Sequence, residues 1–190
     1  MKALRDAALR RAWRKLAAEA PRVPEGPMQW GGNSRALVLY DADDPRQAGQ
    51  AAALTLADFG VDERLPHSKR APELLAWTAT VPSVPEAAGA PTDALAWHPK
   101  RLAFSGLPKP EAAAAVLAKA YDLVVNLHPR AFPPFDYLAA SARAHLRAVG
   151  HDEAGDWRDG EPVYDLVIRA TPARFVPELR AYLRALNPTI

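Results

Sequence analysis

The sequence predicts an α/β protein: a single three-layer domain with a mostly parallel sheet of five to six strands, preceded by a basic N-terminal helix. Apolar runs of strand length alternate along the chain with stretches of helical periodicity, as in sheets with crossover helices. The strand-like runs are continuously apolar, which is typical of strands buried on both faces. A length of 190 residues suits one full-sized core.

Residues 1–20 form the predicted basic amphipathic helix. Its apolar residues and its cations recur at helical spacing on opposite faces: Leu9, Trp13, Leu16 and Ala20 against Arg10, Arg11, Arg14 and Lys15. The first 22 residues hold seven lysines and arginines and two acidic residues. The remainder of the chain holds 17 lysines and arginines and 20 acidic residues. Three prolines mark 21–34 as a linker, so we expect a basic appendage on a mildly acidic domain at 35–190.

The first half of that domain begins with a strand at 35–40 and a helix. Asp44-Pro45-Arg46-Gln47 starts the helix, because it supplies a capping carboxylate, a proline at the first helical position and a glutamine at the third. Gly60 is expected to end it. The other expected elements are a strand at 61–65, a mostly irregular connection at 66–100 with a helical turn at 72–77, and a strand at 102–104.

The second half predicts three strands and three helices: strands at 121–127, 145–149 and 163–169, and helices at 110–120, 134–142 and 172–186. We expect the strands that start near Arg35, Tyr121 and Val163 in the sheet interior. The closing helix should bury one stripe, namely Phe175, Val176, Leu179, Tyr182, Leu183 and Leu186. The whole pattern predicts a Rossmann-like domain.

One block of this half resembles part of an enzyme family. Asp122–His128 (DLVVNLH), Tyr137–Ala142 (YLAASA) and Arg147–Gly150 (RAVG) look like a block in the acceptor-side domain of heptosyltransferase-type GT-B glycosyltransferases. This resemblance implies kinship with one half of such an enzyme. The half that holds the donor nucleotide has no room in a chain of this length.

A second resemblance covers most of the chain. Gly106-Leu107-Pro108-Lys109, Asp122–Asn126, Val149-Gly150 and Tyr164–Ile168 follow one another as in a small family of single-domain Bacteroidota proteins of uncharacterised function. That family also has a basic N-terminal helix and a closing helix. The resemblance implies the fold and no particular activity.

Six polar residues lie in or just beyond the carboxyl ends of predicted strands, where open α/β sheets bind ligands: Asp41, Asp43, Asn126, His128, Arg130 and His151. An Asp-x-Asp pair can hold Mg²⁺ or supply a nucleophile, and an imidazole beside a guanidinium can hold an anion. The other interpretation is structural. Asp44 then caps the helix, Asp41 and Asp43 shape the turn, and Asn126 satisfies loop backbone.

Several function classes lack their signatures. The chain has no cysteine, which excludes disulfides, zinc–thiolate sites and a thiol nucleophile and fits a cytoplasmic address. No apolar run approaches the roughly 20 residues of a membrane span, and the charged N-terminus is unlike a secretory signal. Phosphate-binding glycine loops and the H-E-x-x-H and G-x-S-x-G motifs are missing. We therefore predict no metal and no cofactor.

Two hypotheses of function follow. The first is a non-catalytic α/β module that acts through a protein partner, with residues 1–20 as the contact element. Nucleic acid or an anionic membrane surface are other partners that this basic helix would suit. The second is a small-ligand or nucleotide-sugar-related enzyme whose site lies at the carboxyl ends of the strands.

Overall fold

The structure is a computed structural model, and it describes residues 35–54, 72–79, 95–151 and 163–186. It also describes positions 7, 11, 14 and 18, which are helical and lie within the predicted N-terminal helix. The predicted linker at 21–34 and the predicted strand at 61–65 lie outside the described residues.

The described strands form one sheet of six, and every neighbouring pair is parallel. The order across the sheet is β3-β2-β1-β4-β5-β6, which is the order of the doubly wound dinucleotide-binding folds. The strands are β1 (Ala36–Asp41), β2 (Glu73–Trp77), β3 (Leu95–Trp97), β4 (Ala120–Asn126), β5 (Arg143–His151) and β6 (Leu166–Arg169). The predicted Rossmann-like α/β class is confirmed.

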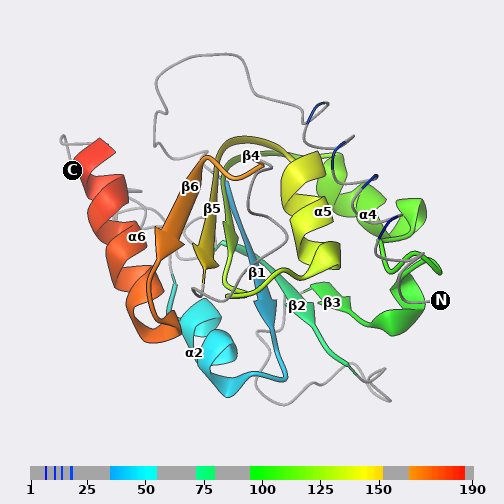
Figure 1. Ribbon diagram of the computed structural model, residues 1–190, viewed down its shortest axis with the longest axis horizontal. Coiled ribbons are helices and arrows are strands. Elements are labelled where there is room, and N and C mark those ends of the chain that lie inside the picture. Colours follow the sequence, from blue (N-terminus) through cyan, green and yellow to red (C-terminus); the bar gives the residue numbers. More distant parts are fainter. Residues whose placement is uncertain are drawn as a thin grey trace.

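Helices cover both faces of the sheet and complete the three layers (Figure 1). They are α2 (Pro45–Ala53), α4 (Pro110–Leu117), α5 (Pro133–Ser141) and α6 (Pro172–Leu186). The buried side chains of α2 and α6 join one core cluster, and those of α4 and α5 join the other. Each central strand contributes to both clusters, as Leu37 and Val38 do in β1. Burial on both faces explains why these strands are continuously apolar.

The start of α2 agrees with its sequence signal. The Asp44 carboxylate accepts a hydrogen bond from the backbone N–H of Arg46 at 2.9 Å, and Pro45 occupies the first helical position. The helix ends at Ala53, well before Gly60, so Gly60 is not its stop signal. The N–H of Leu54 donates to backbone carbonyls of the last turn and closes the helix instead.

The prediction for 66–100 was wrong in part, because β2 and β3 both lie within it. A helical turn was expected where β2 runs, since Glu-Leu-Leu-Ala-Trp has good local helix propensity. Pairing with β1 on one side and β3 on the other overrides that propensity. The strand expected at 102–104 is also wrong. Leu102 forms only an isolated bridge to Pro108, across a turn in which Gly106 takes φ = 82°.

Two expectations for the end of the chain need correction. The strand expected at 163–169 is shorter, and β6 lies at the edge of the sheet rather than in its interior. In α6 the predicted stripe is buried at four positions, but Tyr182 and Leu186 are 42% and 52% exposed. An edge strand leaves less sheet surface for the helix to cover. Within the described part of the chain, no helix combines the length and apolarity that a membrane span requires.

Candidate functional site

The candidate residues of the sequence gather along the carboxyl edge of the sheet. The strand order reverses between β1 and β4, and ligands of open α/β sheets bind outside the carboxyl ends at such a point. Asp41 ends β1, and Asn126 ends β4 in register with Leu39 of β1. His151 ends β5, the next strand along. The structure therefore brings the strand ends that carry these residues side by side.

The acidic turn after β1 is held by its own carboxylates. Asp41 accepts a hydrogen bond from the N–H of Asp43 at 2.9 Å, and Asp43 accepts one at 2.6 Å from the N–H of Ala79, just beyond β2. Gln47 accepts from the N–H of Asp41 and donates to Asp44. The predicted cap at Asp44 is confirmed, and its two neighbours shape the turn. That either one also binds a ligand stays a prediction.

This turn is also poorly suited to a phosphate group. In dinucleotide-binding folds the corresponding turn after the first strand is rich in glycine, and it presents backbone N–H groups at a helix N-terminus to the phosphates. Here Asp41, Asp43 and Asp44 surround the start of α2 with negative charge, and they take up backbone N–H groups themselves. Charge repulsion would oppose a phosphate at this place.

Asn126 belongs to a buried polar network. Its side chain and that of Asp136 are fully buried. The Asn126 amide donates to the Tyr164 hydroxyl at 2.9 Å and to Asp136 at 3.3 Å, and it accepts from the N–H of His128 at 3.0 Å. Tyr164 in turn donates to Asp136 at 2.6 Å. The second oxygen of Asp136 accepts from the N–H of Phe132, at the start of α5. Asn126 therefore fixes the loop after β4, as its structural interpretation predicts.

We expect Tyr164→Phe to cost roughly 1.5–3 kcal/mol of unfolding free energy, because it leaves the buried Asp136 carboxylate without one donor. Tyr182→Phe is the matched control, since Tyr182 is 42% exposed on α6 and should change stability by less than about 0.5 kcal/mol. Urea denaturation of both variants measures the difference. Equal stabilities would mean that the network contributes nothing to the fold.

His128 and Arg130 belong to a turn that is held by a contact between these two residues. The Nδ1 atom of His128 lies 2.8 Å from the backbone oxygen of Arg130. The imidazole stacks on Phe132 with ring centroids 5.0 Å apart, and Phe132 meets Trp77 of β2 at the same distance, edge to face. The imidazole is thus positioned by an aromatic cluster over the carboxyl edge. The side chain of Arg130 is exposed.

The described residues offer no metal centre. Among them, no three histidine or acidic side chains come together in a way that could hold an ion. The carboxyl edge therefore combines an acidic turn, a buried amide network and a stacked imidazole, each engaged in hydrogen bonds within the chain.

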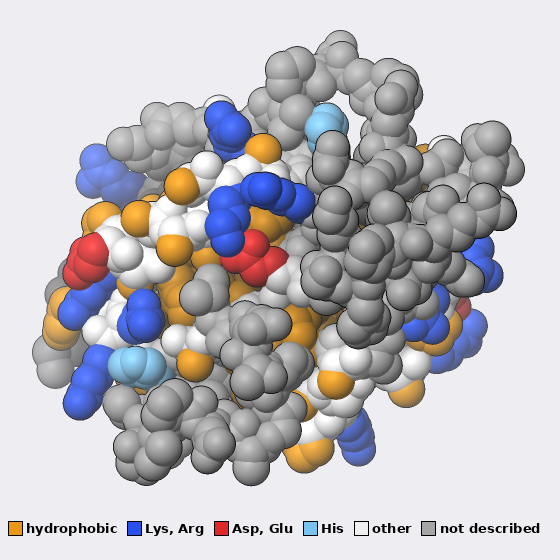
Figure 2. All heavy atoms as spheres, turned by 180° about the vertical axis from the view of Figure 1, so that it is seen from behind, with side chains coloured by type: hydrophobic (Ala, Val, Ile, Leu, Met, Phe, Trp, Pro, Cys, Tyr) orange, Lys and Arg blue, Asp and Glu red, His pale blue; other side chains and the backbone are white. Residues whose placement is uncertain are grey.

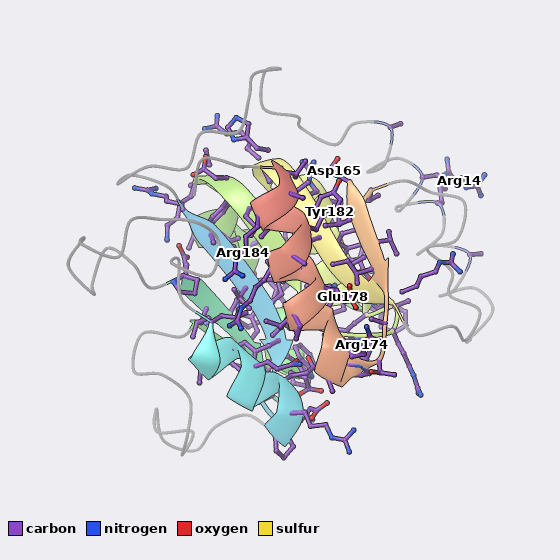
Figure 3. All side chains as sticks on the ribbon, turned by 90° about the vertical axis from the view of Figure 1, so that its left-hand side faces the viewer. Arg14, Asp165, Arg174, Glu178, Tyr182 and Arg184 are labelled. Atoms are coloured by element: carbon purple, nitrogen blue, oxygen red, sulfur yellow. The ribbon has the colours of Figure 1, made fainter. Side chains whose placement is uncertain are left out.

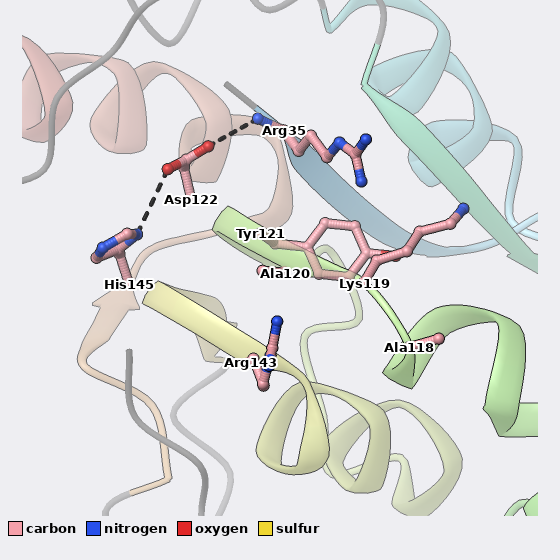
Figure 4. A pocket seen from close by; sticks show the side chains of 8 residues that line it. All are labelled: Arg35, Ala118, Lys119, Ala120, Tyr121, Asp122, Arg143 and His145. Atoms are coloured by element: carbon pink, nitrogen blue, oxygen red, sulfur yellow. Dashed lines mark hydrogen bonds and ion pairs between the residues drawn. The ribbon is translucent and has the colours of Figure 1, made fainter. Parts of the chain in front are cut away.

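A cavity of about 540 Å³ lies at the opposite, amino edge of the sheet (Figure 4). Its lining comes from the residue before β1, the turn between α4 and β4, and the first residues of β4 and β5: Arg35, Ala118, Lys119, Ala120, Tyr121, Asp122, Arg143 and His145. None of the six residues predicted at the carboxyl edge lines it. Three of the lining residues are lysine or arginine, so this cavity is basic.

One ion pair and one contact between a histidine and an aspartate shape the cavity wall. Lys119 reaches Glu73, at the start of β2, with Nζ 2.8 Å from both carboxylate oxygens. Asp122 accepts a hydrogen bond from the N–H of Arg35 at 2.8 Å, and its other oxygen lies 3.4 Å from Nδ1 of His145. The start of β4 is thereby tied to β2, to β1 and to β5.

Tyr121 forms the buried side of the cavity. Its side chain is 1% exposed, and its buried hydroxyl lies near the Glu73 carboxylate. Burial raises the pKa of this phenol above its ordinary value, and the nearby Glu73 carboxylate raises it further, while the Arg35 guanidinium lowers it by less. Tyr121 therefore stays protonated at neutral pH and can only act there as a neutral hydrogen-bonding group.

Our sequence analysis missed this cavity, although the sequence holds a signal for it. A cation stands directly before or at the start of three neighbouring strands: Arg35 before β1, Lys119 before β4 and Arg143 at the start of β5. The amino ends of parallel strands meet at one edge, so these three cations converge once β1, β4 and β5 are neighbours. The six polar residues predicted from the sequence all stand at the carboxyl ends instead.

The N-terminal helix is described at four positions, which include two of the four predicted contact cations. Arg11 and Arg14 are helical and exposed, whereas Arg10 and Lys15 lie outside the described residues.

Comparison with protein-family models, with curated proteins and with solved structures found no match for the chain, and both resemblances drawn from its sequence stay predictions.

Proposed function

We propose that this protein is a non-catalytic α/β module that acts through a partner, with the basic face of its N-terminal helix as the contact element. The observation that carries the proposal is the common face of Ala7, Arg11, Arg14 and Ala18. These positions follow one another at steps of four, three and four residues, and all four are helical and exposed. Arg14 lies well away from α6 in the side view (Figure 3).

The state of the carboxyl edge supports the non-catalytic part of the proposal. A general acid, base or nucleophile must reach a substrate from a pocket. Here Asn126 is fully buried in a polar network, and Asp41 and Asp43 hold backbone N–H groups. These groups serve the loops around them.

The surface charge supports an acidic partner. Lysine and arginine side chains are more frequent than acidic ones on the described part of the rear face (Figure 2). Such a surface attracts anionic groups over distances of about 10 Å at moderate salt. A partner protein with an acidic surface in the cytoplasm fits best, because four cations form a small footprint for nucleic acid or membrane.

Charge reversal on the full-length chain tests the proposal. We expect Arg11→Glu/Arg14→Glu to abolish retention of partner protein from a native lysate, and binding by the unaltered chain should weaken steeply as salt is raised. Arg46→Glu/Arg184→Glu is the matched control, because it removes two exposed arginines elsewhere and changes the net charge equally. Nuclease treatment and vesicles of anionic lipid distinguish the other classes of partner. Equal retention by both variants would contradict the proposal.

The second candidate is the small-ligand or nucleotide-sugar-related enzyme, and one observation favours it. His128, positioned by Phe132 and by the Arg130 carbonyl, follows β4 beside the point where the strand order reverses. Binding of a nucleotide sugar that His128→Ala abolishes, with the fold intact by circular dichroism, would establish this candidate in place of the module.

A further inference from the structure

The amino-edge cavity holds hydrogen-bond donors that no other described residue uses. The guanidinium groups of Arg35 and Arg143 are exposed, and neither forms an ion pair or side-chain hydrogen bond with another described residue. The Tyr121 side chain lies beside them, and its buried hydroxyl is near the Glu73 carboxylate. Two guanidinium groups that line one cavity without a counter-charge among the described residues favour an anion there.

The remaining charges of the cavity are compensated within the chain. Lys119 is bound to both oxygens of Glu73, and His145 faces Asp122. The carboxylates of Glu73 and Asp122 offset two of the three lysine and arginine charges, which leaves one in excess. Arg35 and Arg143, which have no side-chain partner among the described residues, supply that excess charge.

We infer that this cavity binds a small organic anion, whose carboxylate or phosphate group is held between Arg35 and Arg143. A guanidinium presents parallel N–H donors that match the paired oxygens of a carboxylate or a phosphate. In Figure 4 the side chains of Arg35 and Arg143 extend toward the Tyr121 ring from the starts of different strands, whereas the end of Lys119 points away from it.

The size of the cavity indicates an organic body on the anion. Sites for small molecules typically enclose about 300–1,000 Å³, and this cavity of about 540 Å³ lies within that range. A bare inorganic ion would fill little of it. The lining also has apolar surface for such a body, from Ala118, Ala120 and the ring of Tyr121.

Tyr121 supplies a neutral wall beside the two arginines. Burial and the Glu73 carboxylate raise the pKa of its phenol, so the hydroxyl keeps its proton at neutral pH and places no negative charge beside the anion.

The test is a titration of the full-length chain followed by ¹H–¹⁵N NMR at constant ionic strength. The probes are ribose 5-phosphate, citrate and inorganic phosphate, with sodium chloride as the reference salt. We expect saturable shifts at the amides of Arg35, Tyr121 and Arg143, and tighter binding of an organic probe than of inorganic phosphate. The first two probes distinguish a phosphate from a carboxylate ligand.

Two variants assign the binding to the arginine side chains. Arg35→Gln and Arg143→Gln should each weaken binding about tenfold or more, as loss of a charge-assisted hydrogen bond does. Tyr121→Phe should change binding by less than about threefold, since the buried hydroxyl lies near Glu73 and is not exposed to the cavity. Arg184→Gln, an exposed arginine on α6, is the matched control and should bind normally.

Saturable binding of any of the three probes that requires both Arg35 and Arg143 supports the inference. It is overturned if no probe saturates at millimolar concentration, if chloride produces the same shifts, or if Arg184→Gln weakens binding as much as the cavity variants do. The result is independent of the N-terminal helix, because Arg11→Glu/Arg14→Glu leaves every residue of the cavity in place.

Discussion

Val124→Asp is expected to prevent the chain from folding. Val124 lies in the middle of β4, is 0% exposed and packs in the core beneath α4 and α5. Even a protonated carboxyl without partners costs roughly 2–7 kcal/mol in such surroundings, and the charged form costs more. The lost packing of the valine adds to this. Since a domain is stable by only about 5–15 kcal/mol, little or no folded protein should remain.

The same change on the sheet edge provides the control. Val167 of β6 is 45% exposed, so Val167→Asp leaves its carboxylate in water and should retain most of the stability. Circular dichroism and a urea titration of both variants give the comparison. A Val124→Asp chain that unfolds cooperatively near the midpoint of the unaltered protein would mean that β4 is not central to the fold.

The elements that our sequence analysis placed well have strong local signals. β4 contains the apolar run Leu-Val-Val, α6 has a periodic stripe, and the start of α2 has its capping carboxylate and proline. β2 was missed because a strand buried on both faces lacks alternation, and Leu, Ala and Glu also favour helices. Only its two neighbouring strands make it a strand, and those pairings are not local.

The order of the strands in the sheet could not be predicted from the sequence either. β6 was expected in the interior because its residues are apolar, yet it is the last strand of the order and pairs only with β5 among the described strands. Crossover helices leave open on which side of the sheet each new strand is added. The same gap explains why the amino-edge cavity went unnoticed: its lining depends on β4 and β5 being neighbours.

The sequence cannot tell whether a polar residue at the carboxyl edge binds a ligand or holds the fold together. Asp41, Asp43 and Asn126 stand where a ligand site would be expected, and the sequence does not reveal which groups they bind within the chain. Asp136 and Tyr164, the partners of Asn126, lie 10 and 38 residues away in sequence. Only the packing of α5 against the sheet shows that the amide faces inward.

Arg147 is another polar residue whose partners the sequence does not reveal. An arginine in a strand suggests an exposed side chain, but Arg147 is 2% exposed within β5. Its Nε donates to the carbonyl of Ala139 at 2.8 Å and its Nη2 donates to the carbonyl of Ala142 at 2.9 Å. These carbonyls belong to the carboxyl end of α5, where backbone oxygens lack partners within the helix and a cation is favourable. Asp165 lies 3.7 Å from Nη1.

We therefore expect Arg147→Met to lower the unfolding free energy by about 3 kcal/mol, because it strips buried carbonyls and Asp165 of a charged donor. For a chain of this size that corresponds to a fall of roughly 6–12 °C in Tm. Arg147→Lys keeps the charge but loses the planar fork, so it should recover only part of the loss. Arg143→Met, an exposed position in the same strand, should change stability by less than about 0.5 kcal/mol. If both methionine variants melted at the same temperature, the guanidinium of Arg147 would contribute nothing to stability. Other groups would then form the hydrogen bonds to the carbonyls at the end of α5.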